Sequence, residues 1–434
     1  MCLTYLLAQS RRNNPNLRVF AATIDHAYRA NSAQEATAVG SVVSKWNVDH
    51  FVGRLSYRND PQTMSNFEEV ARTLRYEKLR EICVAKDIDT LLVAHNFDDC
   101  LETFLQRLLM NSTIFGLAGL TSTSTMPLPP QSPEENIQIL RPLLKFSKKD
   151  IRDFCTTNNV TWFEDVSNTD TLLTQRNKLR YMINEYVPEI QRSRPEVLAV
   201  SREQLSATLE QIQALVASYN TQKQIFDTYV KQHSYVFNTK NCSISFSLPS
   251  SQWRQFNNPV IAKWLYEQVY PLSSAKNYHW SYAKFERQAM ERIQKYISSD
   301  DVAPFQLNYV GVLFQVKKRD NELIFKLSKQ PPLAEHRNAK VLITSKWHLF
   351  ANTWWIRLGD NYDKPYFLRW YNVHYKKKVL EKFPELKSGK DLFYSRIGNV
   401  PILVDECDTV VGLPTHGLYD QRVAGQCRPK TPLF

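Results

Sequence analysis

The stretch LLVAHNFDDCLETFLQRLL, residues 91–109, passes from an apolar run into a group of ionisable side chains: His95, Asp98, Asp99 and Glu102. The apolar run predicts a buried strand, and the spacing of the later apolar residues predicts a helix that begins two residues after the histidine. Carboxylates in a first helical turn lie at the positive end of the helix dipole, so ordinary capping is one explanation. Capping does not explain the whole group, because the glutamate lies on the same helix face as the two aspartates.

Adjacent carboxylates destabilise a fold unless a cation or a proton donor lies between them. Magnesium bound to the phosphates of a nucleotide is a common solution, since it takes one or two carboxylates together with phosphate oxygens. From the residues alone, a nucleotide-linked site and capping with surface charge are equally good interpretations of residues 91–109.

The sequence around this stretch alternates strand and helix patterns. The predicted elements are, in order, a strand at 17–25, a helix at 31–46, a helix at 66–87 and a strand at 89–95. This order predicts a parallel sheet with right-handed crossovers. Ligands of such sheets bind at the carboxyl ends of the strands. Asp25 and His26 lie at that end of the first predicted strand.

The remaining sequence predicts further domains. Residues 121–136 are rich in Ser, Thr and Pro and predict a solvated loop, a short strand follows at 137–144, and a helix begins at Ser147. The pattern is helical and polar from about 191 to 235 and becomes strand-like and aromatic beyond 240. We therefore expect a nucleotide-binding domain over 1–190, a helical then mixed middle domain over 191–335, and a C-terminal domain over 336–434.

Composition adds three expectations. Lys and Arg outnumber Asp and Glu by 55 to 43, a formal net charge of +12. This favours a nucleic-acid partner, although excess charge also simply keeps proteins in solution. The seven cysteines show neither CxxC nor zinc-ligand spacing, which predicts reduced thiols and no structural metal. No apolar run reaches the roughly 18 residues that cross a bilayer, so we expect a soluble globular protein without a membrane partner.

The motif AHNFDDCLETFLQRL resembles AHHxDDxxETxLxRL of the tRNA(Ile)-lysidine synthetases, a branch of the N-type ATP pyrophosphatases. Four other stretches are similar to motifs of that family in the same order: IDHAYRANS at 24–32, NFEEVARTLRY at 66–76, ILRPLL at 139–144 and WFEDVSNTDTLLTQRNKLRYMI at 162–183. A weaker likeness to the family's C-terminal domain lies in KKKVLEKF and in VPILVDECDTVVGLP at 400–414.

The resemblance implies an α/β fold of the adenine nucleotide alpha hydrolase-like type, followed by a helical middle region and a mixed α+β C-terminal domain. It also implies a ligation that uses ATP and Mg²⁺. The wobble cytidine of tRNA(Ile) with a CAU anticodon is adenylated at its 2-oxygen, and the side-chain amine of free L-lysine then attacks carbon 2. A homodimer is suggested by the resemblance alone.

The same resemblance implies roles for particular residues. The expected catalytic residues are Asp99, Asp98, Glu102 and Arg176, and the two aspartates also bind metal through Mg-ATP. The expected ATP and Mg²⁺ neighbours are His95, Asp25, His26, Arg29, Asn177 and Arg180. Arg176 and Arg180 share a helix face, which suits phosphate contact, while a basic surface helix is the plain alternative. The expected tRNA contacts, with solvated side chains as the alternative, are Arg369, Lys376, Lys377 and Lys378.

One family feature is missing. The family carries SGGxDS before its first helix, a glycine loop whose backbone N–H groups hold pyrophosphate. The 434 residues contain no such stretch, and MCLTYLLAQ at 1–9 predicts the helix that should follow it. We therefore expect the first parallel strand and the phosphate loop to be absent, and poor or no ATP-dependent turnover. A chain that begins late is the expected reason, and a degenerate family member is the alternative.

Two other functions remain open from the sequence. One is a catalytically impaired or inactive tRNA-binding homologue, and the other is an ATP-dependent tRNA thiolation enzyme, against which the absence of CxxC argues. Asn111 and Thr113 stand where the family usually has glycine. Such departures lead us to expect a mitochondrial protein, with the bacterial cytoplasm as the alternative.

Overall fold

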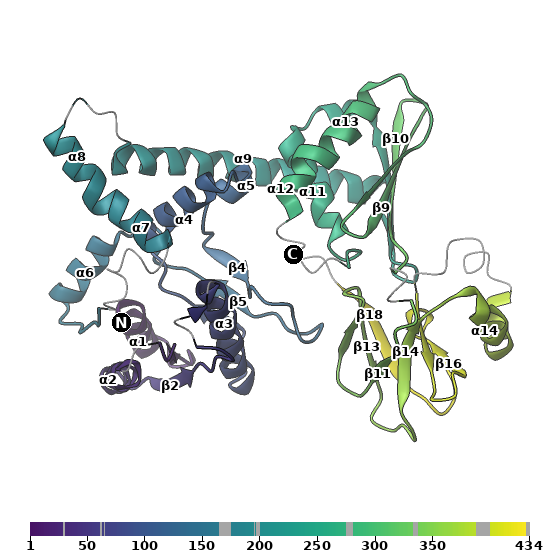
Figure 1. The fold of residues 1–434 in the computed structure, drawn as a ribbon, viewed down its shortest axis with the longest axis horizontal. Coiled ribbons are helices and arrows are strands. Elements are labelled where there is room, and N and C mark those ends of the chain that lie inside the picture. The colour runs from purple at the N-terminus through teal and green to yellow at the C-terminus, as the bar shows by residue number, and fades with distance from the viewer. Residues whose placement is uncertain are drawn as a thin grey trace. The chain divides into compact units, whose positions relative to one another are not determined.

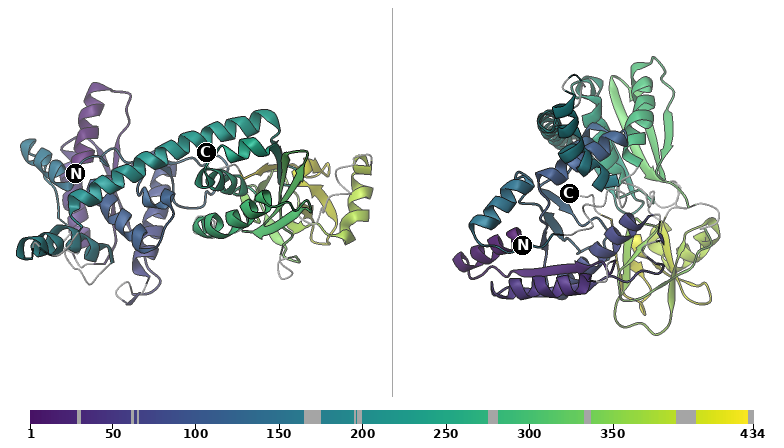
Figure 2. Two further views of the ribbon diagram at one scale, coloured as in Figure 1. Left: turned by 90° about the horizontal axis from the view of Figure 1, so that it is seen from above. Right: turned by 60° about the vertical axis from the view of Figure 1, so that its left-hand side comes forward.

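The structure is a computed structural model that describes residues 1–28, 31–60, 63–64, 66–164, 175–194, 196, 200–274, 281–332, 337–387 and 400–430. The chain divides into two compact units (Figure 1). Unit 1 comprises Met1–Pro130 and Asn136–Val216, and unit 2 comprises Gln131–Glu135 and Ala217–Phe434. Their boundary lies within helix α9 (Arg202–His233), which is continuous over 32 residues (Figure 2). The division into three domains stays a prediction.

Unit 1 has the α/β architecture that the alternating pattern predicts. Strand β1 (Phe20–Asp25) pairs in parallel with β2 (Asp49–Arg54), and β3 (Thr90–Leu92) pairs in parallel with β5 (Gln138–Leu140). Strand β4 (Thr123–Thr125) joins β5 in the antiparallel direction. The loop prediction for this segment was therefore wrong in part, because backbone pairing with a buried strand outweighs a composition rich in Ser and Thr.

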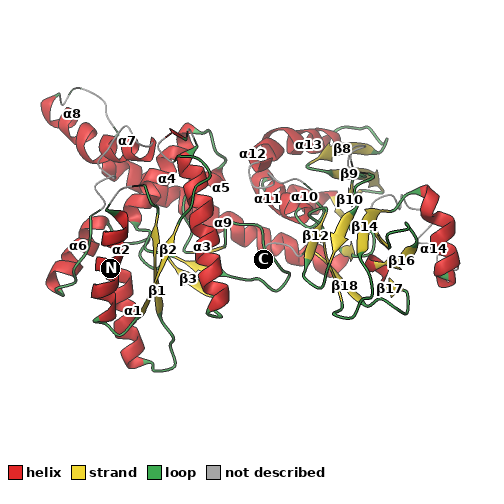
Figure 3. Cartoon of the chain, turned by 60° about the horizontal axis from the view of Figure 1, so that its bottom comes forward, coloured by secondary structure: helices red, strands yellow, loops and turns green. Residues whose placement is uncertain are grey.

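Helices pack on both faces of the parallel pair β1–β2 (Figure 3). Helices α1 (Cys2–Asn13) and α2 (Ser32–Ser44) share a buried cluster with Ala21. Helix α3 (Phe67–Ala85) instead packs in a cluster with Ile24. Because side chains alternate along a strand, Ala21 and Ile24 face opposite sides of the sheet.

The parallel strands of unit 1 form two sheets. Among the described strands, β1 pairs only with β2. Strand β3 pairs only with β5, which pairs with β4 on its other side. Ile24 of β1 and Leu91 of β3 nevertheless pack in one cluster against α3.

The other helices of unit 1 follow β3. They are α4 (Phe97–Leu109), α5 (Ile114–Leu117), α6 (Lys148–Thr157), α7 (Gln175–Tyr181), a π-helical turn at Met182–Tyr186 and α8 (Val187–Ser193). The predicted starts of α4 and α6 are confirmed. Each begins with a capping box, in which the N-cap side chain and the third helical residue exchange hydrogen bonds with backbone N–H groups.

Unit 2 begins, after α9, with an antiparallel sheet in the order β6-β7-β10-β9-β8. Its strands are β6 (Val236–Asn238), β7 (Ser243–Pro249), β8 (Phe305–Tyr309), β9 (Val312–Arg319) and β10 (Glu322–Lys329). Its helical segments are α10 (Ser250–Arg254), α11 (Asn258–Val269), α12 (Tyr282–Lys284), a π-helical turn at Phe285–Ala289 and α13 (Met290–Ser298). The strand-like interpretation beyond residue 240 missed these helices.

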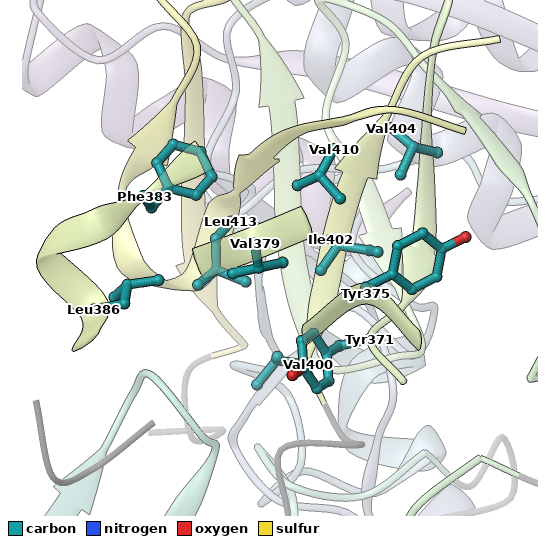
Figure 4. Packing of buried hydrophobic residues seen from close by; sticks show 10 residues of the cluster. All are labelled: Tyr371, Tyr375, Val379, Phe383, Leu386, Val400, Ile402, Val404, Val410 and Leu413. Carbon is teal, nitrogen blue, oxygen red and sulfur yellow. The ribbon is translucent and has the colours of Figure 1, made fainter. Parts of the chain in front are cut away.

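The C-terminal part of unit 2 has two further sheets, in the orders β11-β14-β15-β16-β17 and β12-β13-β18. The strands are β11 (Val341–Ile343), β12 (His348–Phe350), β13 (Trp354–Leu358), β14 (Tyr366–Trp370), β15 (Pro401–Val404), β16 (Val410–Leu413), β17 (Leu418–Tyr419) and β18 (Gly425–Pro429). Helix α14 (Lys376–Lys382) packs on the first sheet, where Val379 lies beside Ile402 (Figure 4). Within the described ranges no helix has the length and apolar character of a membrane span.

Two lysines of unit 2 are buried, Lys430 at 3% and Lys329 at 2% exposed. Their Nζ atoms donate to backbone carbonyls, Lys430 to Ser273 at 3.4 Å and Lys329 to Ala351 at 3.3 Å. Burial lowers the pKa of Lys430 to about 7 and that of Lys329 to about 8. Because the native state then binds fewer protons than the unfolded state, stability is reduced at pH 7 and recovers as the pH rises towards the unfolded pKa.

We expect Lys430→Met to raise the free energy of unfolding at pH 7 by about 1–4 kcal/mol, because it replaces a poorly solvated charge by an apolar side chain. The gain should shrink by about 1.4 kcal/mol per pH unit above pH 7, as the wild-type lysine loses its proton in the native state. Urea unfolding of both proteins from about pH 7 to pH 9 measures this difference. The exposed Lys326→Met is the control, and a gain that does not depend on pH contradicts the expectation.

Candidate functional site

The corner between β3 and α4 begins with a capping box. The Asn96 side chain accepts a hydrogen bond from the backbone N–H of Asp99 at 3.1 Å, and Oδ2 of Asp99 accepts one from the N–H of Asn96 at 3.0 Å. Capping is therefore part of the explanation for Asp99, as the residues alone allowed. Its other oxygen, Oδ1, receives no hydrogen bond within the part of the chain that the structure describes.

Asp98 connects three helices of unit 1. Its Oδ2 accepts a hydrogen bond from the backbone N–H of Lys148 at 2.7 Å, and its Oδ1 lies 2.6 Å from a guanidinium nitrogen of Arg202. These contacts fasten the first residues of α6 and α9 to α4. Both carboxylate oxygens are thus engaged by donors of the protein itself.

Glu102 is a buried carboxylate, 3% exposed, paired with two arginines of α7. Arg180 donates to both of its oxygens, at 2.6 and 3.0 Å, and Nε of Arg176 lies 3.3 Å from Oε2. Burial raises the pKa of Glu102, and the charges of Arg180 and Arg176 oppose that rise. The predicted shared face of the two arginines is confirmed, and both point at Glu102.

Positive charge exceeds negative charge around this pair. The Nε atoms of Arg75 and Arg141 are buried without a hydrogen-bond partner among the described residues, and Arg176 shares its only described carboxylate partner, Glu102, with Arg180. Burial lowers the pKa of Arg75 and of Arg141, and the nearby charge of Arg72 lowers each further. Buried charges are costly unless they are paired, so this cluster suits an anionic ligand.

Neither Arg72 nor Arg75 of α3 has an ion pair within the described residues. The guanidinium of Arg72 instead lies 5.1 Å from the centre of the Tyr76 ring, one turn along α3.

His95 lies half-buried beside this cluster, with Nδ1 buried and without a hydrogen-bond partner in the described residues. Burial lowers the pKa of His95 to about 4, and Arg141 and Arg176 add to the effect, while Asp99 opposes it. The imidazole is therefore neutral at pH 7. It can hydrogen-bond to a ligand without adding to the positive charge.

Asp25 is the last residue of β1, at the carboxyl end of that strand. Its Oδ1 accepts a hydrogen bond from the N–H of Ala27 at 2.8 Å, and Arg54 lies 3.9 Å away. Burial would raise the pKa of Asp25, but hydrogen bonds from Ser32 and Ala27 and the charge of Arg54 lower it overall. His26 is half-buried next to it, and Arg29 lies outside the described residues.

A pocket opens at the carboxyl ends of β1 and β2. It is lined by Ala27, Arg54, Leu55, Ser56, Tyr57, Arg58, Asn59 and Asp60. The Tyr57 ring lies 5.8 Å from that of Phe67, and its hydroxyl is buried without a hydrogen-bond partner in the described chain. The pocket combines an aromatic ring with charges of both signs.

The two aspartates of α4 differ as magnesium ligands. No cluster of three or more His, Cys, Asp or Glu side chains within the described ranges could hold a metal ion. Asp99 has an oxygen to offer, and one carboxylate is enough for Mg²⁺ that is also held by phosphate oxygens. Asp98 would first have to release Lys148 or Arg202. The geometry therefore fits Asp99 better than the predicted pair.

The remaining predicted residues lie in two places. Asn177 is buried on α7, next to Arg176. In unit 2, Arg369 donates to both oxygens of Asp408, at 2.7 and 2.8 Å, so its guanidinium is already engaged. The lysines at 376–378 are exposed at the start of α14. Lys377 lies 3.8 Å from Glu381, and Nζ of Lys378 donates to the backbone carbonyl of Asp408 at 3.4 Å.

Sequence reasoning missed Arg141 and Arg202. Arg141 directly follows β5, at the carboxyl end of a buried strand, and a charged residue in that position was a usable signal. Arg202 contacts Asp98 across 104 positions, and no local pattern marks such a contact.

Residues 1–187 match the family described as the PP-loop domain. The tRNA(Ile)-lysidine synthase of Rickettsia conorii is 34% identical over 154 residues, which cover 36% of this chain and 30% of that protein. The corresponding protein of Rickettsia akari is 36% identical over 160 residues, covering 37% and 34%. That of Rickettsia bellii is 33% identical over 180 residues, covering 42% and 39%.

The chain thus spans between 30% and 39% of the length of these curated relatives. All three are bacterial proteins, so they give no support to the mitochondrial expectation. Among solved structures, the U34-tRNA thiolase NcsA of Methanococcus maripaludis with its [4Fe-4S] cluster matches with a TM-score of 0.36 and 14% identity. That match covers 49% of this chain and 68% of the other.

Proposed function

We propose that this chain, whose residues 1–187 match the PP-loop domain family, acts in the ATP-dependent modification of tRNA. The specific reaction that we propose is the formation of lysidine. The wobble cytidine of tRNA(Ile) with a CAU anticodon attacks the α-phosphate of ATP through its 2-oxygen, and pyrophosphate leaves. The side-chain amine of L-lysine then attacks carbon 2, and AMP leaves with that oxygen.

The observation that carries this proposal is the cluster of arginines around His95 and Glu102. Nε of Arg75 and Nε of Arg141 are buried without a hydrogen-bond partner among the described residues, while Arg176 shares the carboxylate of Glu102 with Arg180. A polyphosphate supplies the negative charge that this cluster lacks, and arginine binds phosphate oxygens in a fixed planar geometry. The cluster lies near the carboxyl end of β3, where ligands of parallel sheets bind.

The proposed roles differ between the three carboxylates of α4. Asp99 would hold Mg²⁺ against the phosphates, and that ion would neutralise charge developing at the α-phosphate. Glu102 is a positioning residue, because it holds the guanidinium groups of Arg176 and Arg180 in place. Asp98 orders α6 and α9 around the site. His95 is neutral at pH 7 and can donate or accept one hydrogen bond there.

The nucleoside of ATP is proposed to occupy the pocket at the ends of β1 and β2. Tyr57 offers an aromatic ring for stacking, and Asp60 offers acceptors for ribose hydroxyls. Asp25, which is 4% exposed and accepts a hydrogen bond from Ala27, orders the loop behind this pocket. The lysines at 376–378 are proposed to contact the tRNA backbone, since exposed cations give sequence-independent affinity for phosphates.

A second candidate function is a tRNA-binding homologue with impaired catalysis. Two observations favour it: the 434 residues lack SGGxDS, and β1 and β3 each keep an unpaired edge among the described strands. Nothing specific favours a thiolation enzyme, because five of the seven cysteines are buried and all are free thiols without CxxC spacing.

Pyrophosphate binding tests the anion site. We expect Arg141→Ala and Arg176→Ala each to weaken binding by about tenfold or more, since a hydrogen bond to a charged group contributes about 1.5–3 kcal/mol. Isothermal titration of the full chain provides the affinities. Arg107→Ala is the matched control, because Arg107 is exposed near the end of α4. An equal loss of pyrophosphate affinity in all three variants would show that pyrophosphate binds non-specifically to basic surface residues, and the proposed site would be wrong.

A further inference from the structure

An aromatic and cationic surface lies on the sheet β12-β13-β18 of unit 2. Trp347 directly precedes β12, and two guanidinium groups lie against its ring. The guanidinium carbon of Arg357 is 4.6 Å from the ring centre, and that of Arg428 is 5.3 Å away. We call Trp347, Arg357 and Arg428 the tryptophan–arginine surface.

Strand register explains why these side chains meet. Arg357 of β13 pairs with Gln426 of β18, and the pairing of His348 with Ile356 brings Trp347 opposite Arg357. Arg428 pairs with Trp355, two positions from Arg357 and therefore on the same face of the sheet. Three different strand segments thus contribute to one surface.

The opposite face of this sheet belongs to the core. Trp354, Ile356 and Leu358 point to that side and are at most 2% exposed. On the tryptophan–arginine side, Trp355 is also covered, at 3% exposed. Trp347 and Arg357 are half-buried and Arg428 is exposed, so the part open to a partner surrounds these three residues.

The two arginines differ in how their charge is balanced. Arg357 donates through Nε and Nη2 to the side-chain oxygen of Gln426, at 3.1 and 2.9 Å, and has no carboxylate partner within the described ranges. Arg428 pairs with Glu134 at 2.9 Å, and both side chains are half exposed. An amide thus fixes the orientation of Arg357 without neutralising its charge.

Internal stabilisation alone is a weak explanation for this arrangement. An exposed cation–π contact contributes about 0.5–1 kcal/mol, and one guanidinium would provide it. Glu134 balances the charge of Arg428, whereas Arg357 has no carboxylate partner in the described ranges, so a polyanion would supply the missing negative charge. Aromatic rings flanked by arginines are also the chemistry by which proteins hold unpaired RNA bases, through stacking and phosphate contact.

We propose that the tryptophan–arginine surface binds an unpaired segment of RNA. A base stacks on the ring and guanidinium planes, and Arg357 and Arg428 contact the flanking phosphates. Glu134 is the competitor that RNA displaces from Arg428. This site lies in unit 2 and uses neither ATP nor lysine, so its binding is measured independently of the reaction proposed for unit 1.

The test measures binding of the full chain to a labelled single-stranded RNA, without ATP, by fluorescence anisotropy at rising salt. We expect Trp347→Ala to weaken RNA binding about tenfold, because loss of the stacking of one base on an aromatic ring has an effect of this size. Arg357→Gln should weaken it and reduce the salt slope by about one. Glu134→Gln should strengthen it, because the competing carboxylate is removed.

Two controls keep the result decisive. Lys326→Gln removes an exposed positive charge from β10 of the same unit and should leave affinity within twofold of wild type. Trp347→Phe keeps an aromatic ring and should retain most of the affinity, which separates stacking from a loss of fold. The proposal is overturned if Arg357→Gln and Trp347→Ala bind as wild type does. It is equally overturned if Lys326→Gln loses as much affinity, or if an RNA duplex or an acidic peptide binds the surface as well as single-stranded RNA does.

Discussion

Replacing Glu102 by Gln is expected to destabilise unit 1 by about 3–5 kcal/mol, the usual cost of removing one partner from a buried ion pair. The glutamate is 3% exposed, and its loss leaves Arg176 and Arg180 facing each other with further arginines nearby. The amide keeps the shape of the side chain, so the effect reports charge rather than packing. Urea unfolding of the full chain, followed by circular dichroism, provides the measurement.

The control for this experiment is Asp153→Asn. Asp153 pairs with Lys149 at 2.8 Å on the exposed side of α6, and such surface pairs contribute little to stability. Pyrophosphate should recover part of the stability lost in Glu102→Gln, because a ligand that binds only the folded state stabilises it. A Glu102→Gln protein as stable as Asp153→Asn would show that the buried pair does not organise unit 1.

The second large effect is expected in turnover. Residues 1–434 should adenylate tRNA at least about a hundredfold more slowly than a relative with an SGGxDS loop, since loss of one preorganised hydrogen-bond donor already costs about 10²–10³ in rate. No SGGxDS stretch is present to hold pyrophosphate, and β1 and β3 keep unpaired edges among the described strands. Transfer of label from α-phosphate-labelled ATP to tRNA measures the rate, with the Rickettsia akari protein as reference.

Supplying the strand and glycine loop tests the cause. A fusion that places a rickettsial strand and SGGxDS loop before Met1 should recover activity, because the new strand can pair with both β1 and β3. The matched control carries the same strand with the loop glycines replaced by valine, which blocks the close approach of backbone N–H groups to phosphate. Normal turnover by residues 1–434 without any addition would refute the expectation.

Local patterns predicted most of unit 1. The apolar run before His95, the apolar spacing after it and the helix start at Ser147 predicted β3, α4 and α6, and these signals depend on residues close in sequence. The helices of unit 2 were missed for a physical reason. Helix α11 is buried on most of its sides, so its sequence NPVIAKWLYEQV lacks the apolar stripe that reveals an amphipathic helix.

The candidate site was predictable in its residue types but not in its pairing. The sequence placed Asp98 and Asp99 side by side on a helix, yet only the fold shows that Arg202 and Lys148 engage Asp98 while Asp99 keeps an oxygen available. Likewise, Arg369 looked available in a basic aromatic stretch, but Asp408 takes its guanidinium. Long-range ion pairs decide which charged groups remain for ligands, and sequence spacing does not encode them.

The formation of lysidine is the central claim, and incorporation of radiolabelled lysine into tRNA(Ile) with a CAU anticodon tests it most directly. The fusion that carries the glycine loop should incorporate lysine only when ATP is present, and Asp99→Asn in the same fusion should lose that activity while it still binds tRNA. Mass spectrometry of the digested tRNA should place the added lysine on the wobble cytidine. A folded fusion that binds ATP and tRNA but leaves the tRNA unlabelled, or one whose labelling is unchanged by Asp99→Asn, would contradict the claim.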